Sequence, residues 1–509
     1  MNIKVACEPI KDFKTQVLVL TVFEEEKDSI SKYTSLDEKL AQKLNKLIES
    51  KEVTGKYKEF TILHTSDEFS SDRVIIMGVG KKEKFTLDKL RAVVSIASRN
   101  ARRMNLHSMV IPIGFHQISI NAEQCSTAIV EGVMLGLYRF QKHKSKKEEE
   151  FMVIKDLTIL LNDETHKTEF ERGIEKGITL SNSTNLTRDV VNEPANFMTP
   201  EIFADEAVKV AERNGLKIKV LNKEDIENEK MGAFLAVNQG SVNPPRLVVM
   251  EYNGGDENDK VLGLVGKGVT FDAGGLSLKP SDAMFRMHCD MAGAGAVLGA
   301  MEAIAKQKLK VNVVAVMPLT ENLIDANSYK LGDVITSREG KTIEILNTDA
   351  EGRLILADAL SYIRSYKKID FLIDIATLTG AIVIALGHFC SGMMGNNEEL
   401  LSIIKKAGQV SGERVWELPL FEEYKSQIKS DIADLENVGG RAGGSITAGI
   451  FLQEFVGETP WVHLDIAATA IMDESIMAYA KDSFLPKEGA TGVGTRLLYY
   501  VAELLARQN

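Results

Sequence analysis

Cysteine is scarce in this chain of 509 residues. The four cysteines, Cys7, Cys125, Cys289 and Cys390, lie far apart, and none belongs to a CxxC pair. This spacing argues against a cysteine-built zinc site and is typical of a protein from a reducing compartment. The first residues, MNIKVACEPIKDFK, contain charges that interrupt the apolar stretch of a signal peptide. We therefore expect a cytoplasmic protein.

The chain also has few histidines, and its net charge is negative. The eight histidines form no HExxH motif and no other zinc-ligand spacing, so we expect other side chains to hold any bound metal. Lysine and arginine number 61 against 72 acidic residues, which gives a net charge of -11. A chain with this balance is poorly suited to gripping phosphate backbones, and we expect no nucleic acid as its main partner.

Only one long segment lacks charge, from Ile375 to Asn397, and its length imitates a membrane span. It contains Thr377, Gly380 and Gly387 among other polar or small residues, and Asp374 stands directly before it. The mixture predicts a buried strand, a turn and further core. We expect no membrane partner.

The length and the alternation of apolar segments predict two domains. A chain of 509 residues exceeds the size at which one hydrophobic core stops growing. Strand-like and helical segments alternate as far as LTILL (157–161), and an amphipathic stretch then leads to NEPANFMTP. We predict an α/β protein with a smaller N-terminal α/β domain (1–165), a connecting helix (166–191) and a larger C-terminal catalytic domain (192–509).

The second half alternates again, with more apolar strands. These segments read LKIKVL, RLVVMEY, VLGLVG, VNVVAVM, TIEIL, FLIDIA and WVHLDIA, with helices such as AGAGAVLGAMEAIAKQK between some of them. Near-continuous apolar strands are typical of a sheet whose two faces are buried. We expect one large mixed β-sheet covered by helices.

Three glycine-rich stretches resemble phosphate-binding loops but are incomplete. GKGVTF (266–271) lacks the third glycine of a dinucleotide fingerprint, and GVGKK (78–82) lacks the first glycine of a P-loop. GATGVGTR (489–496) precedes a helix but follows no clear strand. We interpret all three as tight turns.

Acidic residues gather where apolar segments of the second half end. Lys267 follows VLGLVG, Asp272 lies in KGVTFDAGG, Asp290 precedes a helix, and Asp349 and Glu351 follow TIEIL. In open α/β sheets the carboxyl ends of strands meet at one edge, where ligands bind. Each acid alone could be a turn residue or a helix N-cap. Four carboxylates together would repel one another unless cations neutralised them, and the set predicts a two-metal hydrolase.

These motifs also resemble a known family. NTDAEGRL (347–354) matches the signature of the leucine aminopeptidase family of dinuclear metallopeptidases. KGVTFDAGGLSLKP (267–280) and MHCDMAGA (287–294) resemble the other metal-binding stretches of that family, and WVHLDIA and GGSITAGIFLQEF (443–455) resemble further segments. The resemblance covers the second half in the family's order. The first half is similar to the family only in its alternation of strands and helices.

The resemblance implies that two divalent cations are bound by Lys267, Asp272, Asp290, Asp349 and Glu351. Of these, Asp272 and Glu351 would bridge the two cations. A lysine ligates only as the neutral amine, and an amine nitrogen among carboxylates moves the preference toward transition metals. We expect manganese or zinc, with cobalt or magnesium as alternatives. A bound cation makes water a usable nucleophile near neutral pH.

The resemblance also implies a catalytic pair. Lys279 would stabilise the developing oxyanion, and Arg353 would hold a bicarbonate ion that takes the proton of the attacking water. Arg353 could instead form a salt bridge with Glu351 or be a surface charge at the helix start. Ala273 stands where the family usually has a small hydroxyl residue, and Ala468 often corresponds to glycine. Neither residue is an expected ligand.

The expected activity is removal of N-terminal amino acids, with leucine-like residues preferred, from short peptides with a free N-terminus. The resemblance implies a homohexamer. One alternative is another two-metal hydrolase, such as a phosphoesterase, although NTDAEGRL and Lys267 argue against it. The other is an additional non-catalytic role in DNA binding, which the net acidity disfavours.

Overall fold

The computed structural model describes residues 1–509 except 25–29, 32, 34, 66–68, 114–120, 146–153, 474–475, 477–482 and 509. The described chain forms two compact units. The first contains residues 1–182 and 483–487, and the second contains 183–476 and 488–508. The division falls within helix α4 (Lys167–Asn192), which therefore contributes to both units.

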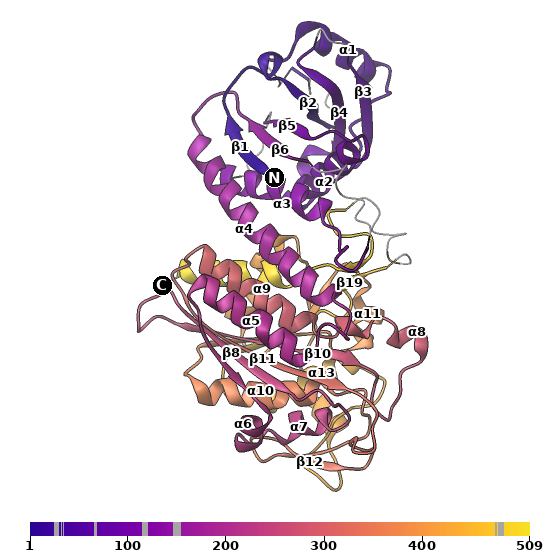
Figure 1. Ribbon diagram of the computed structural model, residues 1–509, viewed down its shortest axis with the longest axis vertical. Helices are drawn as coiled ribbons and strands as arrows, with labels where there is room; N and C mark the ends of the chain where they lie inside the picture. Colours follow the sequence, from indigo (N-terminus) through magenta and orange to yellow (C-terminus); the bar gives the residue numbers. More distant parts are fainter. Residues whose placement is uncertain are drawn as a thin grey trace. The chain divides into compact units, whose positions relative to one another are not determined.

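The first unit is built on a six-stranded sheet (Figure 1). The strand order is β1-β6-β5-β2-β4-β3, and every neighbouring pair is parallel except β3 and β4. The strands are β1 (Asn2–Ala6), β2 (Thr15–Phe23), β3 (Phe60–His64), β4 (Ser71–Gly80), β5 (Ser108–Pro112) and β6 (Asp156–Leu160). The helices other than α4 are α1 (Glu38–Glu49), α2 (Leu87–Arg103) and α3 (Ala122–Leu137).

Alternate residues of these strands enter two separate cores. Val17 and Val19 of β2 pack in the core that contains α2 and α3. Leu18 and Leu20, which point to the opposite face, pack with Leu40 of α1. This period of two is what a sheet covered on both faces requires.

The second unit contains a nine-stranded mixed sheet. Eight strands follow one another in the order β16-β15-β18-β14-β9-β11-β8-β7. The ninth strand, β10, pairs with β11 and lies outside this linear order. Parallel pairs form the centre, whereas β7, β8 and β15 run antiparallel to neighbours. The strands are β7 (Lys217–Leu221), β8 (Arg246–Asn253), β9 (Val261–Gly266), β10 (Gly268–Asp272), β11 (Asn312–Asn322), β14 (Phe371–Ala376), β15 (Ser391–Gly395), β16 (Val415–Glu417) and β18 (Trp461–Asp465).

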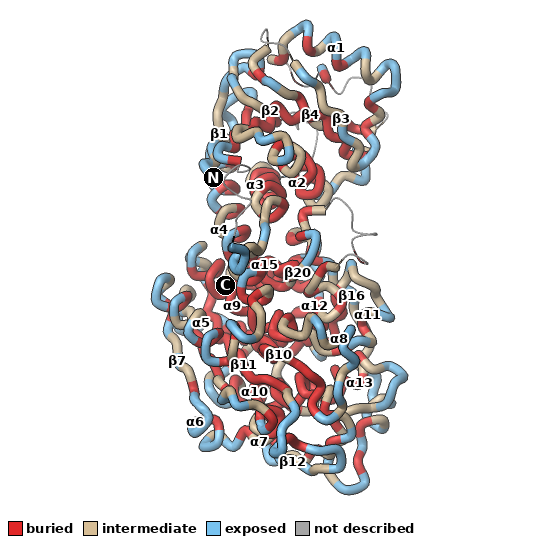
Figure 2. The backbone as a smooth tube through the Cα atoms, turned by 45° about the vertical axis from the view of Figure 1, so that its right-hand side comes forward, coloured by how far each residue is buried: buried red, intermediate tan, exposed pale blue. Residues whose placement is uncertain are grey.

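Helices cover both faces of this sheet, and the central strands are buried along their length (Figure 2). One face packs against α7 (Gly232–Asn238), α10 (Gly352–Tyr366) and α13 (Gly444–Gln453). The other carries α5 (Pro200–Asn214), α9 (Ala292–Lys306), α12 (Glu398–Ser411) and α15 (Thr495–Ala506). Shorter elements are α6 (Lys223–Asn228), α8 (Ser281–Met284), α11 (Gly380–Leu386), and a two-stranded sheet of β19 (Ile471–Met472) and β20 (Gly489–Ala490). The predicted α/β class, with a mixed sheet covered by helices, is confirmed.

Two expectations about apolar segments were wrong. TIEIL is not a strand of the large sheet, because only Thr342–Glu344 is extended, as β13 of a separate three-stranded sheet with β12 (Val334–Thr336) and β17 (Leu435–Glu436). The uncharged run 375–397 contains a helix, α11, in which Ile384 is 89% exposed, so this part is not all buried core. Among the described helices, none is long and apolar enough to cross a membrane.

The tight-turn interpretation is wrong for two of the glycine-rich stretches, because GKGVTF lies in β9 and β10 and the glycines of GVGKK lie in β4. Close packing explains these glycines. A Cβ on Gly266 would lie 2.6 Å from the carbonyl oxygen of Gly293, so this glycine lets β9 approach the start of α9. A Cβ on Gly78 would lie 2.0 Å from the carbonyl oxygen of Lys56. In the third stretch, Glu413 accepts hydrogen bonds from the backbone nitrogens of Gly494 and Leu497 at 2.9 and 3.0 Å. A carboxylate therefore already occupies that helix start.

The sheet also buries an ionisable pair. Asp374 of β14 and His463 of β18 are both fully buried, and their Oδ1 and Nδ1 atoms lie 2.6 Å apart. The indole nitrogen of Trp461 donates to the other carboxylate oxygen at 2.7 Å. Burial alone would lower the pKa of His463, but Asp374 outweighs it and raises that pKa above the ordinary 6.5.

Candidate metal centre

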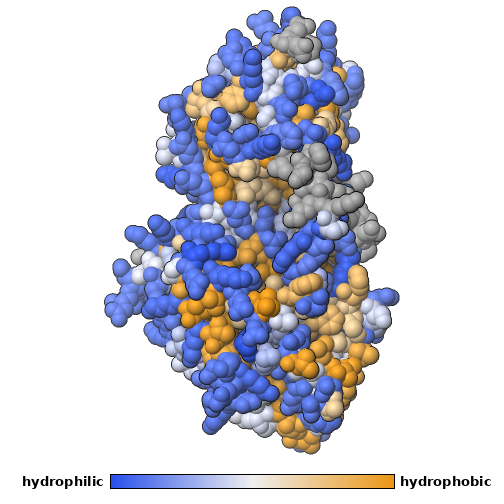
Figure 3. Space-filling view, viewed as in Figure 1, coloured by the Kyte–Doolittle hydropathy of each residue, from blue (hydrophilic) through white to orange (hydrophobic). Residues whose placement is uncertain are grey.

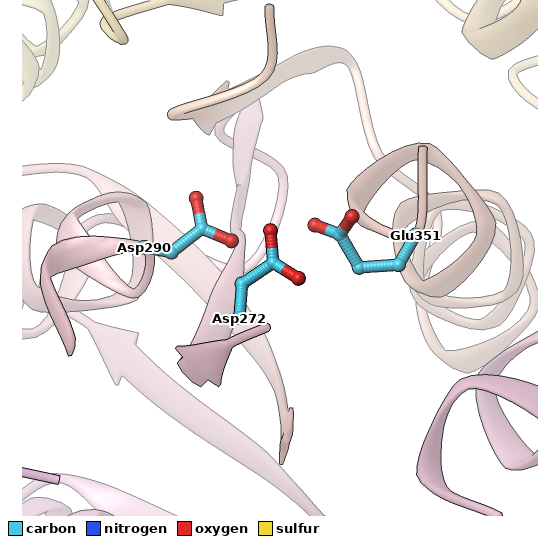
Figure 4. Close-up of side chains that lie close together, drawn as sticks. All are labelled: Asp272, Asp290 and Glu351. Carbon is cyan, nitrogen blue, oxygen red and sulfur yellow. The ribbon is translucent and has the colours of Figure 1, made fainter. Parts of the chain in front are cut away.

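Three carboxylates meet at the edge of the large sheet (Figure 4). Asp272 ends β10, Asp290 follows the short 3-10 helix Met287–Cys289, and Glu351 stands directly before α10. One oxygen from each lies within 4.8 Å of the others, and all three residues are buried. This is the one carboxylate, cysteine or histidine group of metal-binding geometry within the described parts of the chain. No histidine belongs to it.

Two lysines lie among the acidic residues. Lys267 Nζ is 2.8 Å from Asp290 Oδ2 and 2.8 Å from Glu351 Oε1. Lys279 Nζ is 2.8 Å from Asp272 Oδ2 and 2.5 Å from Asp349 Oδ1. The structure thus brings together six of the seven predicted site residues in one linked cluster.

Gly352 leaves room for the side chain of Lys267 to reach the cluster. A Cβ at that position would lie 2.5 Å from the Cε atom of Lys267, so a side chain there would displace the lysine. The glycine of NTDAEGRL therefore provides the space through which the ammonium group reaches Glu351.

The cluster is electrostatically strained without further cations. Burial and the neighbouring Glu351 raise the pKa of Asp272 to about 6, and burial raises the pKa of Asp290 well above its ordinary range. Burial opposes ionisation of Glu351 as well, but Lys267 and Lys279 lower its pKa. The same acids raise the pKa of Lys267 against the effect of its burial.

Charge and donor chemistry fit divalent cations. Four carboxylates against two ammonium groups leave two negative charges in a largely buried site. Asp290 Oδ2 and Asp349 Oδ1 contact lysines but accept no hydrogen bond of regular geometry. Carboxylate oxygens with one potential amine donor are ligands suited to manganese, zinc or cobalt. The residues present can therefore hold such ions.

Arg353 lies close by but has a different environment. It is 6% exposed, and no carboxylate lies within ion-pair distance of it among the described residues. Its Nη1 donates to the carbonyl oxygen of Asn437 at 2.7 Å, whereas Nε is buried without a hydrogen-bond partner. Burial lowers the pKa of this guanidinium to about 10. Arg353 therefore neither forms a salt bridge with Glu351 nor lies at the surface, so both alternatives considered for it are wrong.

Hydrogen bonds with three residues outside the predicted set support the cluster and Arg353. Thr377 donates to Asp290 Oδ1 at 2.7 Å, and its carbonyl oxygen accepts from Lys267 at 2.8 Å. Asn322, in register with Asp272, donates to that carboxylate at 2.8 Å. The third residue, Asn437, holds Arg353. In the sequence, Asn322 stands at the end of an apolar strand and Thr377 directly follows FLIDIA, and these positions could have indicated both residues. No comparable signal marks Asn437.

Family models match both parts of the chain. Residues 185–499 match the catalytic domain of the cytosol aminopeptidase family, and residues 19–147 match its N-terminal domain. The chain belongs to the cytosol aminopeptidase family. The predicted resemblance is thereby confirmed, and the protein is a metal-dependent aminopeptidase.

Individual relatives agree over the full length. The chain is 43% identical over 510 residues to a probable cytosol aminopeptidase of Alkaliphilus metalliredigens, covering 100% of each. It is 46% identical over 434 residues to the corresponding protein of Clostridium tetani, covering 85% of this chain and 88% of that one.

Solved structures agree as well. A tomato leucine aminopeptidase mutant has a TM-score of 0.88 at 30% identity, covering 99% of this chain and 96% of its own. A bottromycin maturation enzyme solved in complex with Mn has a TM-score of 0.84 at 30% identity, covering 97% and 100%.

Proposed function

We propose that this aminopeptidase uses two divalent cations, which Lys267, Asp272, Asp290, Asp349 and Glu351 would hold. The convergence of three buried carboxylates within 4.8 Å carries this proposal. Manganese or zinc is the preferred metal, with cobalt or magnesium as alternatives, and the manganese in a structurally similar enzyme supports the first choice. The acids favour the ammonium form of Lys267, so metal binding would release its proton.

When bound, the two cations would polarise the scissile carbonyl and lower the pKa of a water to the neutral range. Lys279 holds positive charge beside Asp272 and Asp349, where it would stabilise negative charge developing on the carbonyl oxygen. Its two ion pairs fix the ammonium in place before substrate arrives.

Arg353 is proposed to hold bicarbonate as the general base. A buried guanidinium with no carboxylate at ion-pair distance among the described residues is costly, and a bound anion would stabilise it further than the more distant Glu351 and Asp465 do. The planar fork of arginine suits a three-oxygen anion of this shape. No described histidine belongs to the carboxylate group and could take the proton instead.

The proposed substrates are short peptides with a free N-terminus and a leucine-like first residue. A free amine offers a nitrogen lone pair within a site made for cations, whereas an acylated nitrogen does not. Leu276 and Leu278, which are 44% and 57% exposed, lie between Asp272 and Lys279 in the sequence and would supply apolar surface for the side chain.

The protein is further proposed to be a cytoplasmic homohexamer. Each chain would consist of an N-terminal domain (1–165), a connecting helix (166–191) and a catalytic domain (192–509). Exposed apolar side chains of the second unit support self-association, and Figure 3 shows such patches on one face. The aromatic and isoleucine side chains of this unit that are at least 60% exposed are Phe285, Ile384, Trp416, Phe421 and Ile432. Light scattering of the purified protein would measure the number of subunits.

Hydrolysis of two matched substrates tests the proposal. Leucyl-p-nitroanilide should be cleaved, and N-acetyl-leucyl-p-nitroanilide should show kcat/KM at least about a thousandfold lower, because its blocked amine cannot orient the scissile bond. Comparable kcat/KM values would refute the requirement for a free amine. A phosphomonoester run in parallel would detect a phosphoesterase, whose turnover would exceed that of the peptide analogue.

A further inference from the structure

Asn437 links two parts of the site that are remote from it in the sequence. It lies directly after β17 and is completely buried. Its backbone nitrogen donates to the carbonyl oxygen of Glu344 at 3.0 Å, which continues the pairing of β17 with β13. Its side chain and its carbonyl oxygen are thereby held in a fixed place beside the loop that leads into α10.

The side chain of Asn437 holds the start of NTDAEGRL. Its Oδ1 accepts from the backbone nitrogens of Leu346 and Asn347 at 2.9 and 3.3 Å, and its Nδ2 donates to the carbonyl oxygen of Asn347 at 2.6 Å. Asn347 in turn accepts a hydrogen bond from the backbone nitrogen of Asp349 at 2.8 Å. These hydrogen bonds hold the backbone of residues 346–349, at the start of the loop that carries Asp349 and Glu351 (the carboxylate loop).

The backbone of Asn437 holds the arginine. The 2.7 Å hydrogen bond to its carbonyl oxygen is the one hydrogen bond that the Arg353 side chain makes within the described chain. The ring of Phe451, 6.0 Å from the guanidinium carbon, lies on one side of the group. One residue therefore sets where the guanidinium lies relative to the loop that carries Asp349 and Glu351.

We infer that Asn437 is a positioning residue for Arg353, which keeps the guanidinium and the carboxylate loop in register for the reaction. Loss of its side chain would free the backbone at Leu346 and Asn347 and would let the carbonyl oxygen that holds Arg353 move with it. The inference rests on the proposed role of Arg353. A displacement of about 1 Å of a catalytic group can lower a rate about a hundredfold.

A double-mutant cycle tests the inference. Asn437→Ala should lower kcat for leucyl-p-nitroanilide about 10- to 100-fold and change KM less than about threefold. In an Arg353→Ala background the same substitution should change kcat less than about twofold, because the residue through which it acts is gone. Metal content of both single variants, measured by mass spectrometry, should equal that of the wild type, because Glu351 and Asp349 keep their own contacts with Lys267 and Lys279. Loss of metal in Asn437→Ala would mean that it acts on the carboxylate loop and would overturn the inference.

Asn238 provides the matched control. It is a buried asparagine of the same unit whose side chain donates to Asn243 O at 3.0 Å and Thr320 Oγ1 at 3.1 Å. Asn238→Ala should lower the melting temperature as Asn437→Ala does, yet keep kcat within about twofold. If Asn437→Ala does not fold, Asn437→Asp, which keeps the acceptor for the two backbone nitrogens, enters the same cycle.

The outcomes separate the two proposals. If Arg353→Ala is impaired and Asn437→Ala lowers kcat equally in both backgrounds, Asn437 does not act through Arg353 and the inference is overturned. Unchanged kcat in Asn437→Ala overturns it as well. If Arg353→Ala retains the wild-type kcat, the proposed role of the arginine fails, and the positioning role fails with it.

Discussion

Replacement of Thr377 by valine tests how strongly a neighbouring hydroxyl group supports the carboxylate cluster. Valine has nearly the same shape and the same branching at Cβ, so the substitution removes the hydroxyl group with little repacking. The lost interaction is the 2.7 Å hydrogen bond from Thr377 Oγ1 to Asp290 Oδ1. Asp290 would keep its contacts with Lys267, at 2.9 Å to the same oxygen.

The expected magnitude follows from the ionised acceptor. A hydrogen bond to a charged group contributes about 1.5–3 kcal/mol, which corresponds to roughly 10- to 150-fold in an equilibrium constant. Loss of outer partners of metal ligands typically weakens metal binding 10- to 100-fold, which is the same range. Since Asp290 keeps a second donor, we expect the lower end, a roughly tenfold weaker affinity for manganese in Thr377→Val.

Calorimetric titration of the metal-free protein with manganese measures this affinity. Thr377→Ser keeps the hydroxyl group and should bind within about twofold of the wild type. Thr270→Val is a matched control, because Thr270 is fully buried in β10 and donates at 3.2 Å to the carbonyl oxygen of Thr320 instead of to a carboxylate. Wild-type affinity in Thr377→Val, or equal weakening in Thr270→Val, would refute the reasoning.

Three further predictions concern charged groups. Glu351→Gln should lose most bound metal and activity while keeping its circular dichroism spectrum, and full activity would remove the two-cation proposal. Arg353→Ala should lower kcat more than it raises KM; a change in KM alone would make Arg353 a substrate-binding residue. Because Asp374 raises the pKa of His463 above 6.5, the pair contributes most below that pH and its contribution is lost as pH rises through the raised pKa. His463→Gln should therefore lower the melting temperature more near pH 6 than near pH 9, and an equal loss at both would contradict the shift.

The sequence predicted part of the cluster because Lys267 and Asp272 follow apolar segments and stand beside glycines. Lys267 and Asp272 indeed lie at the ends of β9 and β10 in the large sheet. Asp349 and Glu351 also join the cluster as predicted, but TIEIL, which resembles any other strand in sequence, pairs through only three residues and in a different sheet. Their approach to Asp272 depends on the path of the loop before α10, which has no periodic pattern.

The supporting polar residues could not be found in this way. Asn437 stands in LENVGG, a stretch whose composition predicts only a loop. Its role arises from β17 pairing with β13, across some ninety residues of sequence. A lone asparagine or threonine has no spacing signal, so its partners become visible only when the tertiary structure brings the segments together.

Metal content measured together with activity tests the central claim most directly. The protein is purified with manganese, its bound metal is counted by mass spectrometry, and leucyl-p-nitroanilide turnover is followed during chelation and during return of the metal. We predict two divalent ions per chain, loss of activity as they are removed, and recovery when they are restored. Full turnover by protein free of divalent metal would contradict the account.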